Sequence, residues 1–239
     1  MPPELIVALD MPSSQALGTL LQSLPREIAW FKVGLELFAA EGPRALAPLH
    51  AQGKKIFLDL KLHDIPRTVE RTVAAAAQHS VGMLTLHAAG GRAMLKAAAQ
   101  AAQAIGPNAP KLIAVTSLTS LSQTDLAEIG VSRALKDQAL ALGKLALDSG
   151  LDGLVASAQE AEHLRRHFGQ KPLLVTPGIR PADGALGDQK RVATPTLAVQ
   201  AGSNFLVVGR PILDADDPRT AALAILNEMR IASGSGQHN

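Results

Sequence analysis

The sequence has no cysteine, no tyrosine and a single tryptophan among its 239 residues, and aromatic residues make up only 3% of it. Without cysteine, the chain can form no disulfide, no thiolate metal site and no cysteine nucleophile, and redox usage does not indicate a compartment. Nucleic-acid-binding proteins use basic runs and aromatic stacking. Neither feature is present, which argues against nucleic acid as a partner.

Long apolar runs are also missing. No window offers about 18 uninterrupted apolar residues, so we expect no membrane-spanning helix. The opening stretch, MPPELIVALD, passes directly into a strand-like run, and we expect no secretory signal and a cytoplasmic location. The net charge of +2 suits an anionic small molecule. Residues 233–239 are small and polar and are expected to form a flexible tail.

Eight short apolar runs alternate with Ala- and Leu-rich helical patterns. The predicted strands cover residues 5–10, 29–35, 55–61, 82–88, 111–118, 153–157, 172–178 and 204–209. The predicted helices cover residues 13–24, 36–52, 66–79, 91–105, 132–149, 159–168 and 211–231. Strict alternation predicts a parallel sheet covered by helices, and eight units predict one (β/α)8 TIM barrel over residues 1–232.

An open, doubly wound sheet is the alternative fold. It usually carries a glycine-rich fingerprint after the first strand, and ALDMPSS, at residues 8–14, contains no glycine. The segment 178–203 fits the alternation least well, because it is rich in Gly, Pro and charge. We expect a long loop with one short helix there, and long loops in compact domains are usually functional or disordered.

Charged residues stand near the C-terminal ends of three neighbouring predicted strands, where active sites of this fold lie. Because side chains alternate along a strand, Asp10, Lys32, Asp59 and Lys61 should point into the barrel while their apolar neighbours face the helices. A buried ionic network could be structural, but such networks are poor stabilisers, which favours a functional role. His63, at the rim, is compatible with either a loop hydrogen bond or a direct role.

Two Gly–Arg turns follow the last two predicted strands. Gly178 and Arg180 leave the seventh, and Gly209 and Arg210 leave the eighth at the start of a helix. TIM barrels commonly bind phosphate at this place, through backbone N–H groups and a basic side chain. Gln189 could donate to the same phosphate from the long loop. We expect no metal, because the seven histidines lack ligand spacing and lysines compete for the carboxylates.

The stretch FLDLKLHDIPRTV resembles the orotidine 5′-phosphate decarboxylase family in its Asp-x-Lys-x-x-Asp arrangement of Asp59, Lys61 and Asp64. The resemblance covers essentially the whole chain. It includes ALD at 8–10, FKVG at 31–34, VTSLTS at 115–120, TPGIRP at 176–181, GDQKRVATP at 187–195 and VVGRPI at 207–212.

The resemblance implies decarboxylation of orotidine 5′-phosphate to UMP, the last step of de novo pyrimidine synthesis, without metal or cofactor. It also implies a homodimer with active sites at the interface, into which Asp64 reaches from the neighbouring subunit. Lys61 resembles the lysine that protonates C6. The implied catalytic residues are Lys32, Asp59, Lys61 and Asp64. The implied substrate-binding residues are Asp10, Lys32, Asp64, Thr68, Thr119, Pro177, Arg180, Gln189, Gly209 and Arg210.

Two other functions are compatible with parts of the pattern. A magnesium-dependent sugar-phosphate decarboxylase or hexulose-phosphate synthase shares Asp-x-Lys-x-x-Asp, but Lys32, the LTS at 118–120 and Gln189 favour the nucleotide. A catalytically silent nucleotide-binding barrel is opposed by the presence of both lysines and both carboxylates.

Overall fold

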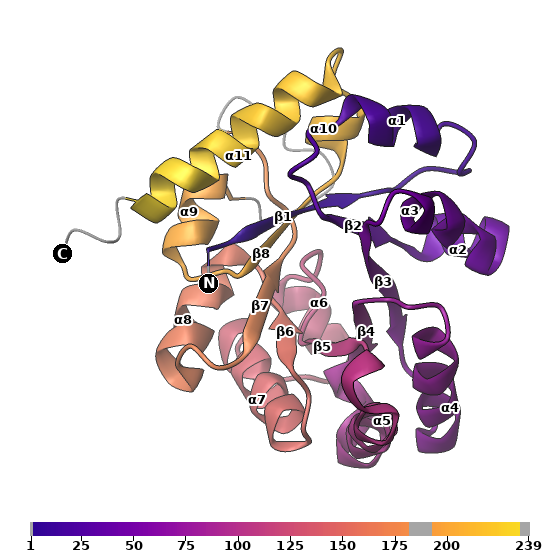
Figure 1. Cartoon of the computed structure of the whole chain (residues 1–239). Coiled ribbons are helices and arrows are strands. Elements are labelled where there is room, and N and C mark those ends of the chain that lie inside the picture. The colour runs from indigo at the N-terminus through magenta and orange to yellow at the C-terminus, as the bar shows by residue number, and fades with distance from the viewer. Residues whose placement is uncertain (1, 182–192, 235–239) are drawn as a thin grey trace.

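Eight parallel strands close into a barrel in the computed structural model, which describes residues 2–181 and 193–234 (Figure 1). The strands are β1 (Glu4–Ala8), β2 (Trp30–Val33), β3 (Lys55–Leu62), β4 (Met83–His87), β5 (Lys111–Val115), β6 (Gly153–Val155), β7 (Leu173–Thr176) and β8 (Phe205–Val208). Each strand pairs with its neighbours in sequence, and β1 pairs with β8. The predicted (β/α)8 architecture is confirmed.

Helices cover the outside of the barrel (Figure 1). They are α1 (Leu17–Ser23), α2 (Leu35–Glu41), α3 (Ala47–Ala51), α4 (Pro66–Ala77), α5 (Gly91–Ile105), α6 (Gln123–Glu128), α7 (Leu135–Asp148), α8 (Ala158–Phe168), α9 (Pro195–Gln200), α10 (Arg210–Leu213) and α11 (Pro218–Gly234). Short 3-10 turns lie at Gly42–Leu46, Ala88–Gly90 and Gly106–Asn108. Within this part of the chain, no helix combines the length and hydrophobicity that crossing a membrane requires.

Several helix boundaries differ from the prediction. The helix predicted over 36–52 is broken at Gly42, whose φ of 59° lies in the left-handed region, and Pro43 follows it. The helix predicted to begin at residue 13 begins at Leu17, and its N-cap residue, Ala16, supplies no side-chain cap; the nearby Ser14 hydroxyl donates to Glu41 Oε2 at 2.5 Å instead of to the helix.

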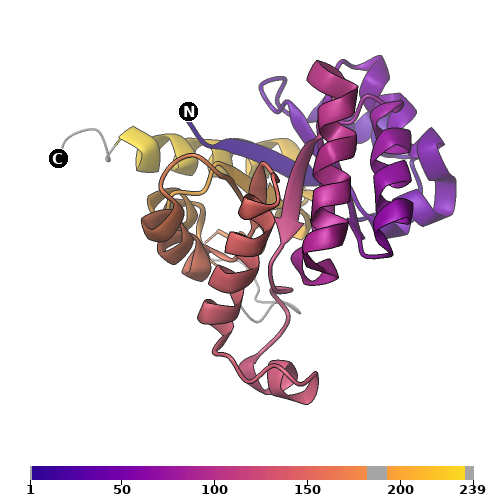
Figure 2. The same ribbon diagram turned by 90° about the horizontal axis from the view of Figure 1, so that it is seen from below.

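Two further differences lie near the C-terminal end and after β5. The helix predicted over 211–231 is two helices, α10 and α11, and α11 extends to Gly234, inside the segment expected to be a flexible tail. Helix α6 was not predicted; it begins with a capping box between Ser122 and Asp125. In Figure 2, α6 stands away from the rest of the molecule, between β5 and α7.

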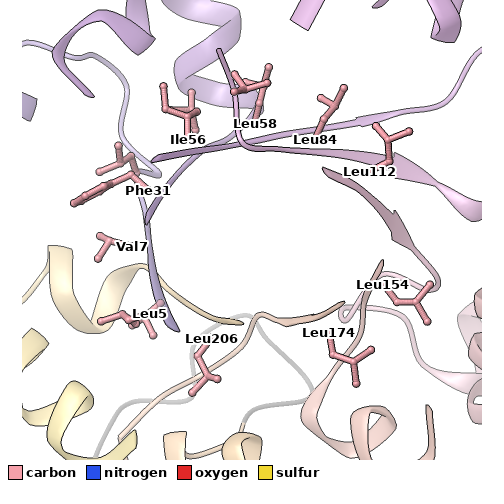
Figure 3. Close-up of a cluster of buried hydrophobic side chains, with 14 of the residues drawn as sticks. Leu5, Val7, Phe31, Ile56, Leu58, Leu84, Leu112, Leu154, Leu174 and Leu206 are labelled. Atoms are coloured by element: carbon pink, nitrogen blue, oxygen red, sulfur yellow. The ribbon is translucent and has the colours of Figure 1, made fainter. Parts of the chain in front are cut away.

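The strands separate two apolar layers, as the alternation of their side chains predicts. Figure 3 shows the outer layer, in which Leu5, Phe31 and Leu58 point away from the ring of strands toward the helices. A separate inner cluster fills the barrel, and in it the Trp30 and Phe205 rings meet edge to face at 5.6 Å. The inner cluster consists of Ile6, Ala8, Trp30, Phe57, Met83, Ile113, Val175, Phe205 and Val207.

Strand β3 is irregular at its C-terminal half. Leu58 pairs with Leu84 and Leu62 pairs with Leu86, so four steps along β3 correspond to two steps along β4. Lys61 lies inside this irregularity with a φ of 50°, which is rare for a residue other than glycine. Such strain is typical of functional sites and persists only where surrounding contacts fix it.

Candidate active site

Four charged side chains alternate in sign at the C-terminal end of the barrel. The Lys32 ammonium lies 2.8 Å from Asp10 Oδ1 and 3.7 Å from Asp59 Oδ2, and the Lys61 ammonium lies 2.8 Å from the same Asp59 oxygen. The structure thus brings together the four residues that β-strand alternation had placed inside the barrel. Asp59 occupies the centre of this array, between two ammonium groups.

Asp59 is buried, with 8% of its surface exposed. Burial alone would raise the pKa of this carboxyl group, but Lys32, Lys61 and a hydrogen bond from Thr85 together outweigh it and hold the pKa below its usual range. The group is therefore an anion at neutral pH. Lys61 keeps 31% of its side chain exposed, so it is paired with Asp59 and still partly open to solvent.

The irregular part of β3 is held by Thr85, a fully buried residue of β4. Its hydroxyl donates to Asp59 Oδ1 at 2.8 Å and accepts from the Lys61 backbone N–H at 2.9 Å. Thr85 was not predicted as a site residue, although the sequence carries a signal for it: Thr85 is a polar residue of β4 at an inward position, between Met83 and His87.

A cavity of about 220 Å³ opens beside Lys32, Asp59 and Lys61. Thr119 and Pro177, both predicted substrate-binding residues, line it as well. The other lining residues are Phe57, Val115, Ser117, Leu118, Val155, Val175 and Val207, most of them apolar. A few charged groups at one side of an apolar hollow are typical of a small-molecule site.

The predicted phosphate-binding residues lie at the ends of β7 and β8. Ile179 forms a bridge with Ala193, and the Arg180 backbone N–H donates to the Ala193 carbonyl at 3.0 Å. Gly209 precedes α10, and a Cβ atom there would lie 3.4 Å from Asp10 Oδ2, so this turn lies directly beside the charged array. Arg210 is the first residue of α10. Gln189 lies outside the described residues.

Asp64 and Thr68 do not join the array within this chain. Both are exposed, and the Asp64 carboxylate accepts a hydrogen bond from the Ile65 backbone N–H at 2.6 Å at the start of α4. Within residues 2–181 and 193–234, Asp64 makes no ion pair. Among the described residues, the Lys61 ammonium therefore forms its ion pair with Asp59 alone.

His63 is exposed at the rim, and its ring lies 5.4 Å from the ring of His87 at the end of β4. Burial is the main cause that lowers the pKa of His87, and the nearby His63 and Lys61 lower this pKa further. His87 is therefore neutral at neutral pH and adds no further charge to the array.

The arrangement can stabilise negative charge that develops next to Lys61, because the charges are fixed in place before a substrate arrives. Both oxygens of Asp59 are already engaged, Oδ2 by ammonium groups and Oδ1 by the Thr85 hydroxyl. In the part of the chain that the structure describes, no three His, Asp or Glu side chains group as they would around a metal ion.

Comparison with known proteins covers nearly the whole chain. A sequence model described as "Orotidine 5′-phosphate decarboxylase / HUMPS family" matches residues 3–225. The orotidine 5′-phosphate decarboxylase of Hydrogenovibrio crunogenus is 49% identical over 97% of this chain and 96% of its own length. That of Nitrosococcus oceani is 50% identical over 94% of this chain and 97% of its own.

Solved structures agree with the sequence relatives. The crystal structure of orotidine 5′-phosphate decarboxylase from Lactobacillus acidophilus superposes with a TM-score of 0.83 at 41% identity. The superposition covers 96% of this chain and 99% of that one. An uncharacterised conserved protein from Geobacillus kaustophilus superposes with a TM-score of 0.80 at 38% identity.

Proposed function

Since the chain belongs to the orotidine 5′-phosphate decarboxylase / HUMPS family and is a carboxy-lyase, we propose that it converts orotidine 5′-phosphate to UMP and CO₂ without a metal or cofactor. The observation that carries the proposal is the array Asp10–Lys32–Asp59–Lys61, with its 2.8 Å pair between Lys61 and a buried Asp59 at the cavity.

The proposed chemistry is electrostatic. Loss of CO₂ from C6 leaves a carbanion with no adjacent carbonyl in position to delocalise it, so the enzyme must supply stabilisation through charges fixed in advance. The Lys61 ammonium supplies positive charge where the electron pair develops and then transfers one proton to C6. Asp59 holds this ammonium in place, and its own negative charge disfavours the bound substrate carboxylate relative to the transition state.

The phosphate provides binding energy away from the reacting carbon. Arg180, Gln189, Gly209 and Arg210 are proposed to bind it, and Thr119 and Pro177 to contact the pyrimidine end. Interactions with a remote group can be used to orient the substrate and close the site over it. Closure is the role we propose for residues 178–190, of which 182–190 lie outside the described residues.

We further propose that the site is completed across a homodimer, with Asp64 and Thr68 supplied by the second subunit and Asp10 and Lys32 binding the ribose. Asp64 and Thr68 lie on the surface beside Ile65, which is 67% exposed, and Leu35 at the start of α2 is 56% exposed. Exposed apolar surface that is rimmed by polar residues marks protein–protein contact sites, and Ile65 between Asp64 and Thr68 is a side chain that a second subunit would cover.

The first experiment follows the fall in ultraviolet absorbance as orotidine 5′-phosphate becomes UMP, with EDTA present throughout. The proposal expects rapid turnover that EDTA does not reduce. Turnover that requires added magnesium would point instead to the sugar-phosphate enzymes with the same Asp-x-Lys-x-x-Asp pattern. A folded protein without turnover under either condition would contradict the proposal.

Replacing Lys61 tests the assignment of the proton donor. Lys61→Ala should lower kcat by at least about a thousandfold, because it removes both the positive charge and the proton. Lys144→Ala is the matched control, since Lys144 is exposed on α7 and its ion pair, within the described part of the chain, is with Asp148. Wild-type turnover by Lys61→Ala would show that another group protonates the product.

A further inference from the structure

The Thr85 hydroxyl contacts two parts of the site at once. One is the Asp59 carboxylate, and the other is the left-handed backbone of Lys61. A single hydroxyl serves both, donating to Asp59 Oδ1 at 2.8 Å and accepting from Lys61 N–H at 2.9 Å. Its full burial excludes water as a ready substitute.

The need for a side chain here comes from the strand register. Between the pairs Leu58–Leu84 and Leu62–Leu86, β3 carries more residues than β4 can match, so the ladder between backbones is interrupted. The Lys61 N–H falls in this interruption and finds the Thr85 hydroxyl instead of a carbonyl of β4. A neighbouring strand thus fixes the interrupted segment through a hydroxyl.

We propose that Thr85 is a positioning residue for the decarboxylation: it holds the Asp59 carboxylate and the Lys61 backbone so that the Lys61 ammonium lies at C6 of the substrate. Thr85 itself touches neither the substrate nor the transferred proton. The inference rests on the proposed function, because the geometry that it preserves matters only if Lys61 is the proton donor.

The test compares Thr85→Val, which keeps the shape and loses the hydroxyl, with Thr85→Ser, which keeps the hydroxyl. Thr85→Ala removes the same hydroxyl without placing a methyl group against the carboxylate, and it replaces the valine variant if that variant does not fold. Thr116→Val is the matched control, since Thr116 is a buried threonine just after β5 whose hydroxyl donates, among the described residues, to the Val155 carbonyl and makes no contact with Asp59 or Lys61. For each protein, kcat and KM are measured for orotidine 5′-phosphate, and the dissociation constant of UMP by calorimetry.

Thr85→Val should lower kcat by about 10- to 100-fold, as loss of a hydrogen bond that orients a functional group does, while KM and UMP binding change only a few-fold. Thr85→Ser should recover most of the loss, and Thr116→Val should keep kcat. Three results would overturn the positioning role and leave the proposed function standing. They are a wild-type kcat in both Thr85→Val and Thr85→Ala, a Thr85→Ser variant as slow as Thr85→Val, or an equal loss of kcat in Thr116→Val. An inactive wild-type protein would overturn the proposed function and this role with it.

Discussion

At the scale of single residues, Asp59 is the buried carboxylate that both lysines of the site contact. A buried carboxylate is unfavourable unless it is paired and hydrogen-bonded, and Asp59 satisfies both conditions through Lys32, Lys61 and Thr85. These contacts reverse the effect of burial and leave its pKa below the usual range. The ionised form of Asp59 is thus part of the folded state as well as of the proposed chemistry.

Asp59→Asn should lower the free energy of unfolding by about 2 kcal/mol at pH 7, because two ammonium groups lose their shared partner. The folded-state pKa of Asp59 is depressed, so the stabilisation is fully present above the unfolded pKa, near 4, and is lost as pH falls through the folded value. The difference between the two proteins should therefore shrink below about pH 4.

Urea denaturation followed by circular dichroism from pH 7 to pH 3 measures this difference. Asp148→Asn is the control, since its exposed pair with Lys144 on α7 should contribute at most about 0.5 kcal/mol. An Asp59→Asn difference that stayed constant down to pH 3 would contradict the assignment of the stabilisation to the charge of Asp59.

The residue scale also marks where prediction from sequence succeeds and where it stops. Strand alternation correctly placed Lys32, Asp59 and Lys61 inside the barrel. This was possible because charged residues are easy to recognise where they interrupt apolar strands. Alternation could not indicate that Lys61 takes a left-handed backbone, since that depends on the register between two strands. Thr85 escaped notice because an uncharged threonine is ordinary in a strand.

At the scale of elements, α8 is tied to the starts of β7 and β8 by one buried guanidinium. Arg165 donates to the carbonyls of Gly169, Pro172 and Gly202 and to the Asn204 side chain, at 2.7 to 3.1 Å. It has no carboxylate partner among the described residues, and burial lowers its pKa. The planar fork of arginine suits several acceptors at fixed positions.

Arg165→Met should destabilise the protein by about 3 kcal/mol, because it leaves several buried acceptors without a donor. Arg165→Lys should recover little of this, since one ammonium cannot reach the same acceptors. Arg166→Met is the adjacent control: its pair with Glu162 is exposed and 3.7 Å long, so its loss should stay within about 0.5 kcal/mol. Thermal and urea unfolding measure the stability of each variant. Equal losses of stability in Arg165→Met and Arg166→Met would contradict the role given to the Arg165 hydrogen bonds.

Helices and strands differ in how well their boundaries could be predicted. Every predicted strand is present, because apolar runs of four to eight residues bounded by turns are distinctive. The helix over 36–52 was wrong as a single element, since its Ala- and Leu-rich pattern continues across the break at Gly42. The short α6 depends on its capping box and has too few residues for a periodic signal.

At the scale of the whole molecule, the barrel could be predicted from the number of strands and their alternation with helices. The proposed dimer needs a test in which two different chains assemble. If Asp64 acts across a dimer, Lys61→Ala and Asp64→Ala chains should each be nearly inactive alone. Mixing them after reversible dissociation should restore about a quarter of wild-type activity, because half of the randomly formed dimers are mixed and each mixed dimer has one intact site.

Sedimentation before and after mixing checks that dimers form. As a control, Lys61→Ala mixed with Asp59→Ala should restore nothing, since both residues belong to the same chain's site. Activity in the control mixture would contradict a site shared through Asp64. So would a first mixture that stays inactive although mixed dimers have formed.

Trp30 gives the molecule its own optical reporter. It is the single tryptophan of a chain without tyrosine, and it lies inside the barrel against Phe205. Its indole N–H has no hydrogen-bond partner within residues 2–181 and 193–234. Emission excited near 295 nm thus comes from one compartment, immediately beneath the charged array. A red shift of that emission would signal water entering the barrel, so opening of this compartment can be timed without any added label.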